Sequence, residues 1–152
     1  MRAARVAAVT VGGIAAATML TGCSRPVPYV TIYTGSGSVR VAPQKWCYNP
    51  PTNCSNGGNG NLQTIKAPAG GTLLVDVPGQ VAQQRWLVTS YVQQNGKQQV
   101  IQDASSGLVA DQHSTRVSVP SALAGDQYVL SVQSTNGAHP TGVWGAIVEV
   151  TS

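Results

Sequence analysis

Five side chains in this chain could do covalent or metal chemistry, and they are Cys23, Cys47, Cys54, His113 and His139. A thiol can act as a nucleophile, bind a metal, form a disulfide or carry a lipid. A protein metal site needs several such ligands in a cluster, whereas the histidines stand singly in segments rich in turn residues. We therefore expect no metal and no cofactor.

The segment before the first cysteine looks like an export signal. Arg2 and Arg5 precede a mostly apolar run over residues 6–20, as the charged and apolar regions of a signal peptide do. About 15 residues is short for a membrane span, which needs about 20. An uncleaved anchor and an ordinary signal-peptidase site at residues 15–17 are the alternatives.

The run Leu20-Thr21-Gly22-Cys23 closes this segment and resembles the lipobox of bacterial lipoproteins. In a lipobox the cysteine thiol receives a diacylglycerol, and a peptidase then cuts before the cysteine. The resemblance implies a signal peptide over residues 1–22 and a lipid anchor at Cys23, carrying fatty acyl chains such as palmitate. Two or more acyl chains hold a protein stably on a membrane. We expect the protein on the extracytoplasmic face of the cell membrane.

Export also bears on the two remaining cysteines, because disulfides persist outside the cytoplasm. With Cys23 taken by lipid, the odd cysteine count leaves the pair Cys47 and Cys54. Residues 49–61 between and after them are rich in Asn, Gly and Pro, so we expect an exposed loop without regular structure. A bridge would close a ring of eight residues, worth about 2.5 kcal/mol at most.

Charge argues against a nucleic-acid partner. The whole chain has a formal net charge of +4, but Arg2 and Arg5 belong to the expected signal peptide. After residue 22, seven Lys or Arg minus five Asp or Glu leave +2, and no two basic residues are adjacent. Binding to a phosphate backbone needs a clustered basic stripe, so we expect no nucleic-acid binding.

Enzymatic chemistry is also poorly supported. Ser114 follows His113, but neighbours on a strand point to opposite faces and cannot pair. No Gly-x-Ser-x-Gly segment occurs, and one Glu with four Asp offers few carboxylate pairs. Asp103 and Asp111 flank a Ser-Ser-Gly loop that could hold Ca²⁺, although solvated turn residues are the simpler interpretation. We expect no enzyme and no catalytic residue.

The elements that must carry these residues are strands. Residues 23–28 contain two prolines and predict a short tether, while residues 29–152 are rich in Val, Thr, Ser and Gln with no Phe, which favours one all-β domain. Alternating apolar residues, separated by turn residues, predict seven or eight strands. We expect them at residues 29–33, 39–41, 72–77, 84–94, 97–102, 115–119, 126–134 and 143–150, with residues 62–66 as an optional short strand and a helical turn at 121–124.

Two aromatic residues suggest how those strands pack. Trp86, on a strand that leads into the hairpin signal Asn95-Gly96, resembles the buried tryptophan of immunoglobulin-like sandwiches. Tyr128 resembles their tyrosine corner, and Leu73 and Leu130 stand where the two core cysteines would. We expect an immunoglobulin-like antiparallel β-sandwich in which apolar packing replaces the bridge. The alternative is another sandwich with ordinary core aromatics.

A wider resemblance rests on three segments: Tyr29-Val30-Thr31-Ile32-Tyr33, then Trp46-Cys47 with Cys54, and then residues 78–86. Together they are similar to a family of small actinobacterial lipoproteins known only as a domain of unknown function. The resemblance covers most of residues 27–103, and Arg85 stands where a proline is expected. It implies an actinobacterial membrane and brings no catalytic residues.

Binding is the function class that stays open. Trp46 and Tyr48 adjoin the expected disulfide and the Asn/Gly-rich loop, so they could stack on sugar rings or contact a protein. The alternative is that Trp46 plugs one end of the sandwich. We expect a membrane-anchored accessory module that binds an envelope protein, or alternatively an envelope polysaccharide.

Overall fold

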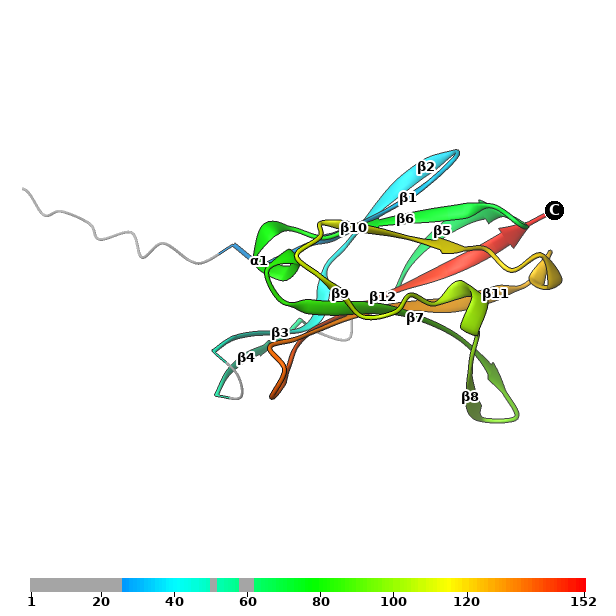
Figure 1. Ribbon diagram of the computed structural model, residues 1–152. Helices are drawn as coiled ribbons and strands as arrows, with labels where there is room; N and C mark the ends of the chain where they lie inside the picture. The colour runs from blue at the N-terminus through cyan, green and yellow to red at the C-terminus, as the bar shows by residue number, and fades with distance from the viewer. Residues whose placement is uncertain (1–25, 50–51, 58–61) are drawn as a thin grey trace, which may run out of the picture.

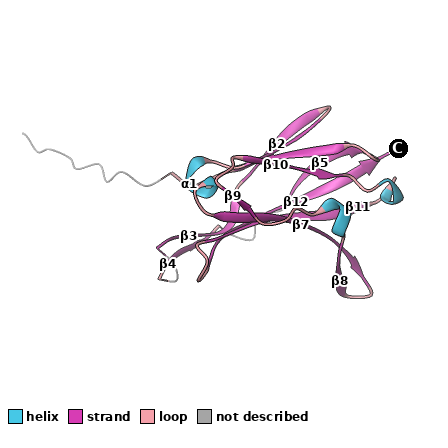
Figure 2. Ribbon diagram, viewed as in Figure 1, coloured by secondary structure: helices cyan, strands magenta, loops and turns pink. Residues whose placement is uncertain are grey.

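The computed structural model describes residues 26–49, 52–57 and 62–152, and these residues form a β-sandwich of two sheets (Figure 1). Strands dominate the secondary structure, and the helices are short turns (Figure 2). The smaller sheet has the order β10-β6-β1-β2, with all neighbours antiparallel. Its members are β1 (Val30–Thr34), β2 (Gly37–Val41), β6 (Thr72–Asp76) and β10 (Ser114–Ser118).

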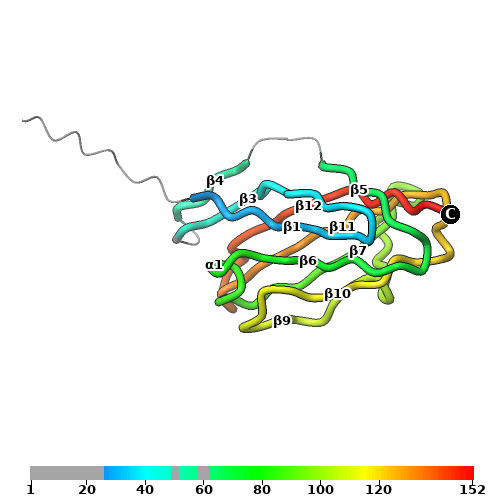
Figure 3. Tube along the Cα trace, turned by 90° about the horizontal axis from the view of Figure 1, so that it is seen from above, coloured from blue at the N-terminus to red at the C-terminus, as the bar shows by residue number. Residues whose placement is uncertain are grey.

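The larger sheet has eight strands, six of them in the order β4-β3-β12-β11-β7-β8. In addition, β5 pairs with β12 and β9 pairs with β7. The strands are β3 (Pro43–Asn49), β4 (Asn53–Asn56), β5 (Gln63–Pro68), β7 (Arg85–Gln94), β8 (Lys97–Val100), β9 (Val109–Ala110), β11 (Gln127–Thr135) and β12 (Pro140–Thr151). Seen from above, β1, β6 and β10 lie over the larger sheet (Figure 3).

Three short helical segments connect strands: α1 (Gly79–Ala82), η1 (Gln102–Ala104) and η2 (Ser121–Leu123). The last of them confirms the predicted helical turn. None of the helices in the described part of the chain is long and apolar enough to cross a bilayer.

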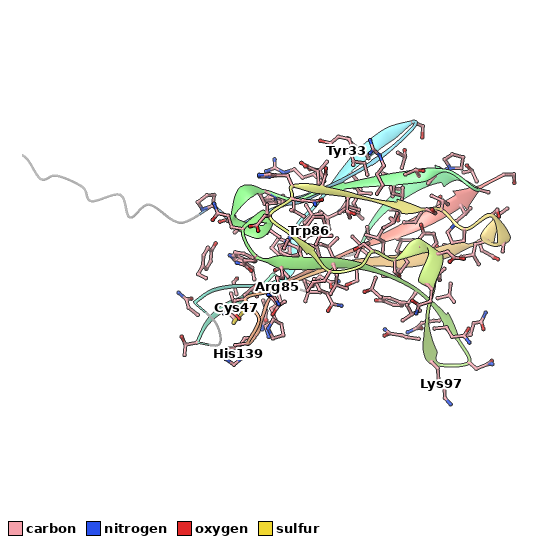
Figure 4. The ribbon with its side chains drawn as sticks, in the orientation of Figure 1. Tyr33, Cys47, Arg85, Trp86, Lys97 and His139 are labelled. Atoms are coloured by element: carbon pink, nitrogen blue, oxygen red, sulfur yellow. A yellow bond between two sulfur atoms is a disulfide. The ribbon has the colours of Figure 1, made fainter. Side chains whose placement is uncertain are left out.

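Side-chain alternation places the core between the sheets, as the sequence predicts. Val30 and Ile32 of β1 are buried while Tyr33 faces outward, because successive side chains on a strand point to opposite faces. Trp86 of β7 is fully buried (Figure 4). Trp144 of β12 is fully buried as well. Leu73 of β6 and Leu130 of β11 join the same core, one from each sheet.

The predicted hairpin is confirmed. Asn95 and Gly96 connect β7 to β8 and both have positive φ, 53° and 73°. A two-residue turn with positive φ at both positions matches the twist of antiparallel strands, which is why Asn-Gly favours it. This hairpin extends away from the sandwich and carries Lys97 at its end (Figures 1 and 4).

Other expectations are wrong in detail. The described residues contain twelve strands rather than seven or eight, and β5 runs parallel to β12 in an otherwise antiparallel fold. Part of the expected loop over residues 49–61 is strand β4, which pairs with β3. Apart from the bridged Cys54 its residues are polar, and the strand lies at a sheet edge, so β4 lacks the apolar alternation by which strands are recognised. Residues 50–51 and 58–61 lie outside the described part.

One residue of β12 departs from the simple alternation of faces. Trp144 and Ala146 point into the core, so Gly145 between them belongs to the outward face, yet it is also buried. A Cβ at this position would lie 2.9 Å from Leu62 and 3.3 Å from the amide of Gln44. The segments that precede β5 and form β3 cover Gly145, and no pattern within β12 carries that information.

Candidate functional site

The disulfide is confirmed. Cys47 and Cys54 are joined with an S–S distance of 2.03 Å, and their Cα atoms are 3.9 Å apart. They face each other in the register of β3 and β4, so the bridge fastens two strands of a hairpin rather than the base of a loop. Both thiols are consumed by this bond. Cys23 lies outside the described residues, as do the expected signal peptide and residues 24–25 of the expected tether.

Trp46 of β3 is paired with Gly142 of the neighbouring strand β12 and is only 3% exposed. Its ring centroid is 5.7 Å from that of Trp144 and 6.0 Å from that of Tyr48, the latter in an edge-to-face arrangement. Gly142 makes this possible, because a Cβ there would overlap the rings of Trp46 and Trp144. A tryptophan so deeply buried offers no free face for stacking on a sugar.

A pocket of about 220 Å³ nevertheless reaches this aromatic group from outside. Apart from one serine and one glycine, its walls are formed by aliphatic or aromatic residues. They are formed by Val27, Tyr29, Ala42, Pro43, Trp46, Tyr48, Ser55 and Gly57. The structure therefore brings the two predicted binding residues together, but as the wall of a small apolar pocket rather than as an open platform.

The indole nitrogen of Trp46 is exceptional among the three tryptophans. Trp86 Nε1 donates to the carbonyl oxygen of Gln112 at 3.0 Å, and Trp144 Nε1 donates to that of Pro28 at 3.0 Å. Trp46 Nε1 is buried and has no hydrogen-bond partner. An unpaired buried donor costs about 1 to 3 kcal/mol, so most such groups find a partner.

A second pocket of about 430 Å³ adjoins the first and shares Tyr29, Ala42, Pro43 and Gly57 with it. It is more polar, since Arg40, Gln44 and Gln63 take part in its lining. The guanidinium carbon of Arg40 lies 4.2 Å from the centroid of the Tyr29 ring, a cation–π contact. Within the described residues the ion pair is Lys66 with Glu149, so no carboxylate pairs with Arg40 there.

Sequence reasoning missed Tyr29 and Arg40 as parts of a site. The antiparallel register of β1 and β2, which pairs Val30 with Val41 and Thr31 with Arg40, brings them together. Both residues follow the ordinary alternation of half-buried strands, so no local signal distinguishes them. Their position beside Trp46 depends on how β3 crosses to the other sheet.

The histidines and aspartates considered above take part in local structure. His113 Nδ1 lies 3.2 Å from the carbonyl oxygen of Val77. The backbone carbonyl of exposed His139 accepts a hydrogen bond from the Thr135 hydroxyl at 2.9 Å, in the turn between β11 and β12. Asp111 adopts positive φ, 54°, as a turn residue can. In the parts of the chain described, no three His, Cys, Asp or Glu side chains gather as metal ligands would.

Tyr128 departs from the geometry of a tyrosine corner. In such a corner the hydroxyl donates to the backbone a few residues upstream. Tyr128 is 1% exposed, but its hydroxyl has no hydrogen-bond partner among the described residues. Burial without a partner raises the pKa of this phenol from 10.0 to about 12, because the phenolate would lose its hydration.

Strand β8 forms one edge of the larger sheet, and all four of its residues are exposed. Val100 is 51% exposed, a large fraction for an aliphatic side chain. In the hairpin, Gln94 pairs with Lys97 and Val92 with Gln99 beside the two-residue turn. Hydrogen-bonded and non-hydrogen-bonded pairs alternate, so Gln98 and Val100 direct their backbone N–H groups away from β7.

These features define a disulfide-bonded β-sandwich domain with an aromatic pocket near the start of its first strand. Comparison with known families matches residues 24–139 to the family described as "Protein of unknown function (DUF2771)", and the chain belongs to this family. Neither the curated proteins nor the solved structures contain a match to the chain.

Proposed function

We propose that this protein is a lipoprotein of the extracytoplasmic membrane face, anchored through Cys23. The sequence Leu20-Thr21-Gly22-Cys23 supports the anchor, and the disulfide between Cys47 and Cys54 supports an oxidising compartment. The tether over residues 23–28 is short, so the sandwich sits close to the bilayer. An actinobacterial envelope is the setting that the family resemblance suggests.

The sandwich is immunoglobulin-like in this proposal. In the larger sheet, β7, β11 and β12 lie side by side in the order of immunoglobulin strands C, F and G. In the smaller sheet, β1, β6 and β10 follow the order of immunoglobulin strands A, B and E. Trp86 then belongs to strand C and Tyr128 to strand F. Leu73 and Leu130 take the places of the two core cysteines, and β8 takes the place of the additional strand C′.

The domain works as a protein-interaction or accessory module without catalytic residues. The free edge of β8 is the observation that carries this proposal. An edge strand presents unpaired N–H and C=O groups, and an extended segment of another protein can pair with them. Gln98 and Val100 supply outward N–H groups, and the exposed Val100 side chain supplies apolar contact. The partner is thus an envelope protein with an extended segment.

Polysaccharide binding is the weaker alternative. It would rest on Trp46 and Tyr48, but Trp46 is 3% exposed and Tyr48 is only half-buried beside it. The pocket that they share is apolar, whereas sugar sites combine aromatic rings with several polar groups. The edge of β8 therefore favours a protein partner over a glycan.

Site-specific photo-crosslinking tests the proposed edge. A photoreactive residue at position 99 in the full-length, membrane-bound protein should capture a discrete protein, whereas one at exposed Gln133, within the same sheet, should not. Gln98→Pro should abolish capture because it removes an outward N–H, while Gln98→Ala keeps that N–H and should retain capture.

Equal capture from positions 99 and 133, or capture that survives Gln98→Pro, would contradict the proposed edge. Capture of a glycan instead would favour the alternative. The anchor is tested in the same cells, since Cys23→Ser should move the protein from the membrane to the soluble fraction.

A further inference from the structure

We propose that the two adjoining pockets around Tyr29 form one binding site for an anionic lipid, of which one acyl chain enters the smaller pocket. The smaller, apolar pocket takes part of the chain, and the larger pocket takes the charged head group at Arg40. Tyr29, Ala42, Pro43 and Gly57 line both pockets, so one molecule can occupy them together.

The size and lining of the smaller pocket define the apolar end of the ligand. Its volume of about 220 Å³ exceeds the roughly 150 Å³ of an engineered apolar cavity that holds one benzene ring. It therefore accepts a short length of alkyl chain, but not a sugar chain or a drug-sized molecule. Val27, Tyr29, Pro43, Trp46 and Tyr48 give it apolar walls.

Trp46 contributes apolar ring surface to the smaller pocket. Its Nε1 has no hydrogen-bond partner in the described structure, but the atom is itself buried by protein, so an oxygen of the ligand does not reach it. Recognition of a polar head group therefore rests on the side chains of the larger pocket.

Arg40 defines the charged end. Its guanidinium is held over the Tyr29 ring, 4.2 Å from the centroid, and pairs with no carboxylate in the described part of the chain. A guanidinium binds carboxylate and phosphate oxygens through paired N–H groups. Gln44 and Gln63 line the same pocket and add amide donors. A head group that carries a carboxylate or a phosphate satisfies this set.

The position of the pocket suggests the membrane as the source of the ligand. Val27 lines the smaller pocket and follows Cys23 by four residues, a reach of about 14 Å in an extended chain. This step rests on the proposed lipid anchor, whereas the site itself does not. A free fatty acid and an anionic phospholipid share the required chemistry, and the experiment separates them.

Photolabelling of the full-length lipidated protein in phosphatidylcholine vesicles tests the site. The probe is a fatty acid that carries a diazirine in its chain, and labelled peptides are mapped by mass spectrometry. The label should fall within residues 40–48, and laurate should displace it. Dioctanoyl phosphatidylglycerol displaces it as well if the site takes phospholipids, whereas displacement by laurate alone identifies a fatty-acid site.

Two matched pairs of variants test the two ends. Arg40→Gln should weaken laurate binding about tenfold, which corresponds to about 1.4 kcal/mol, while Arg116→Gln on β10 should leave it unchanged. Binding of dodecanol, which has a neutral head, should not change in Arg40→Gln.

Tyr29→Ser should also weaken laurate binding, because Tyr29 lines both pockets. Tyr33→Ser should not weaken it, although the two tyrosines are similarly exposed at 40% and 42%.

Several results would overturn the site: no label within residues 40–48, equal effects of Arg40→Gln and Arg116→Gln, or equal effects of Tyr29→Ser and Tyr33→Ser. A photoreactive residue at position 29 that captures a protein rather than a lipid would also overturn it. Failure of Cys23→Ser to release the protein refutes the anchor only, because laurate binding does not depend on the anchor.

Discussion

Replacement of Tyr128 by phenylalanine should stabilise this protein at neutral pH. The Tyr128 hydroxyl is buried in the core and has no hydrogen-bond partner in the described structure. Burial of an unpaired hydroxyl costs about 1 to 3 kcal/mol in mutational data. Tyr128→Phe removes that cost and leaves only a small void, so the free energy of unfolding should rise by about 1 kcal/mol.

The same hydroxyl gives the change a distinctive pH dependence. The pKa of Tyr128 is 10.0 in the unfolded chain and about 12 in the folded protein. Between these values the unfolded chain loses the proton while the folded protein keeps it, so unfolding becomes more favourable as pH rises. A difference of two units corresponds to about 3 kcal/mol. The advantage of Tyr128→Phe should therefore grow from about pH 10 and level off near pH 12.

Urea denaturation of the full-length parent and of Tyr128→Phe, from pH 7 to pH 12, measures both effects. Tyr33→Phe is the matched control, because that tyrosine is largely exposed on β1. If Tyr128→Phe instead lost 1 kcal/mol or more at pH 7, its hydroxyl would have to donate a hydrogen bond, as in a true tyrosine corner. The reasoning from the unpaired hydroxyl would then be refuted.

Two further substitutions test the core that holds the site. Trp86→Ala should lower the free energy of unfolding by about 3 to 5 kcal/mol, because it leaves a cavity at a fully buried position and removes the hydrogen-bond donor to the Gln112 carbonyl. A chemical denaturation midpoint equal to that of the parent would show that Trp86 is not a core residue. Gly142→Ala should lower the free energy of unfolding by roughly 1 to 3 kcal/mol, since the new Cβ would overlap the rings of Trp46 and Trp144 and displace them. Unchanged stability and an unchanged near-ultraviolet circular dichroism spectrum would contradict that contact.

Much of the fold could be predicted because it depends on local patterns. The faces of β1, β6, β7 and the apolar positions of β12 follow from period-two alternation, which any half-buried strand must show. The β7–β8 hairpin follows from Asn95-Gly96, where positive φ is tolerated at both positions. Cysteine arithmetic predicted the bridge between Cys47 and Cys54.

Features that depend on contacts between distant segments could not be predicted in this way. Strand β4 has no apolar alternation, and only its pairing with β3 reveals it. Gly145 is covered by Leu62 and Gln44, which come from other parts of the chain. The parallel pairing of β5 with β12 depends on the path that the chain takes between the two sheets.

The candidate site also combines features that local sequence predicts with features that depend on contacts between remote segments. The sequence by itself determined that Trp46 and Tyr48 stand beside a disulfide, because composition and spacing are local properties. Only the tertiary structure decided that Trp46 is buried with an unpaired N–H. It also decided that Tyr29, which immediately precedes β1, and Arg40 of β2 complete the site. Burial and hydrogen bonding are set by the neighbours that packing supplies, and those neighbours are remote in sequence.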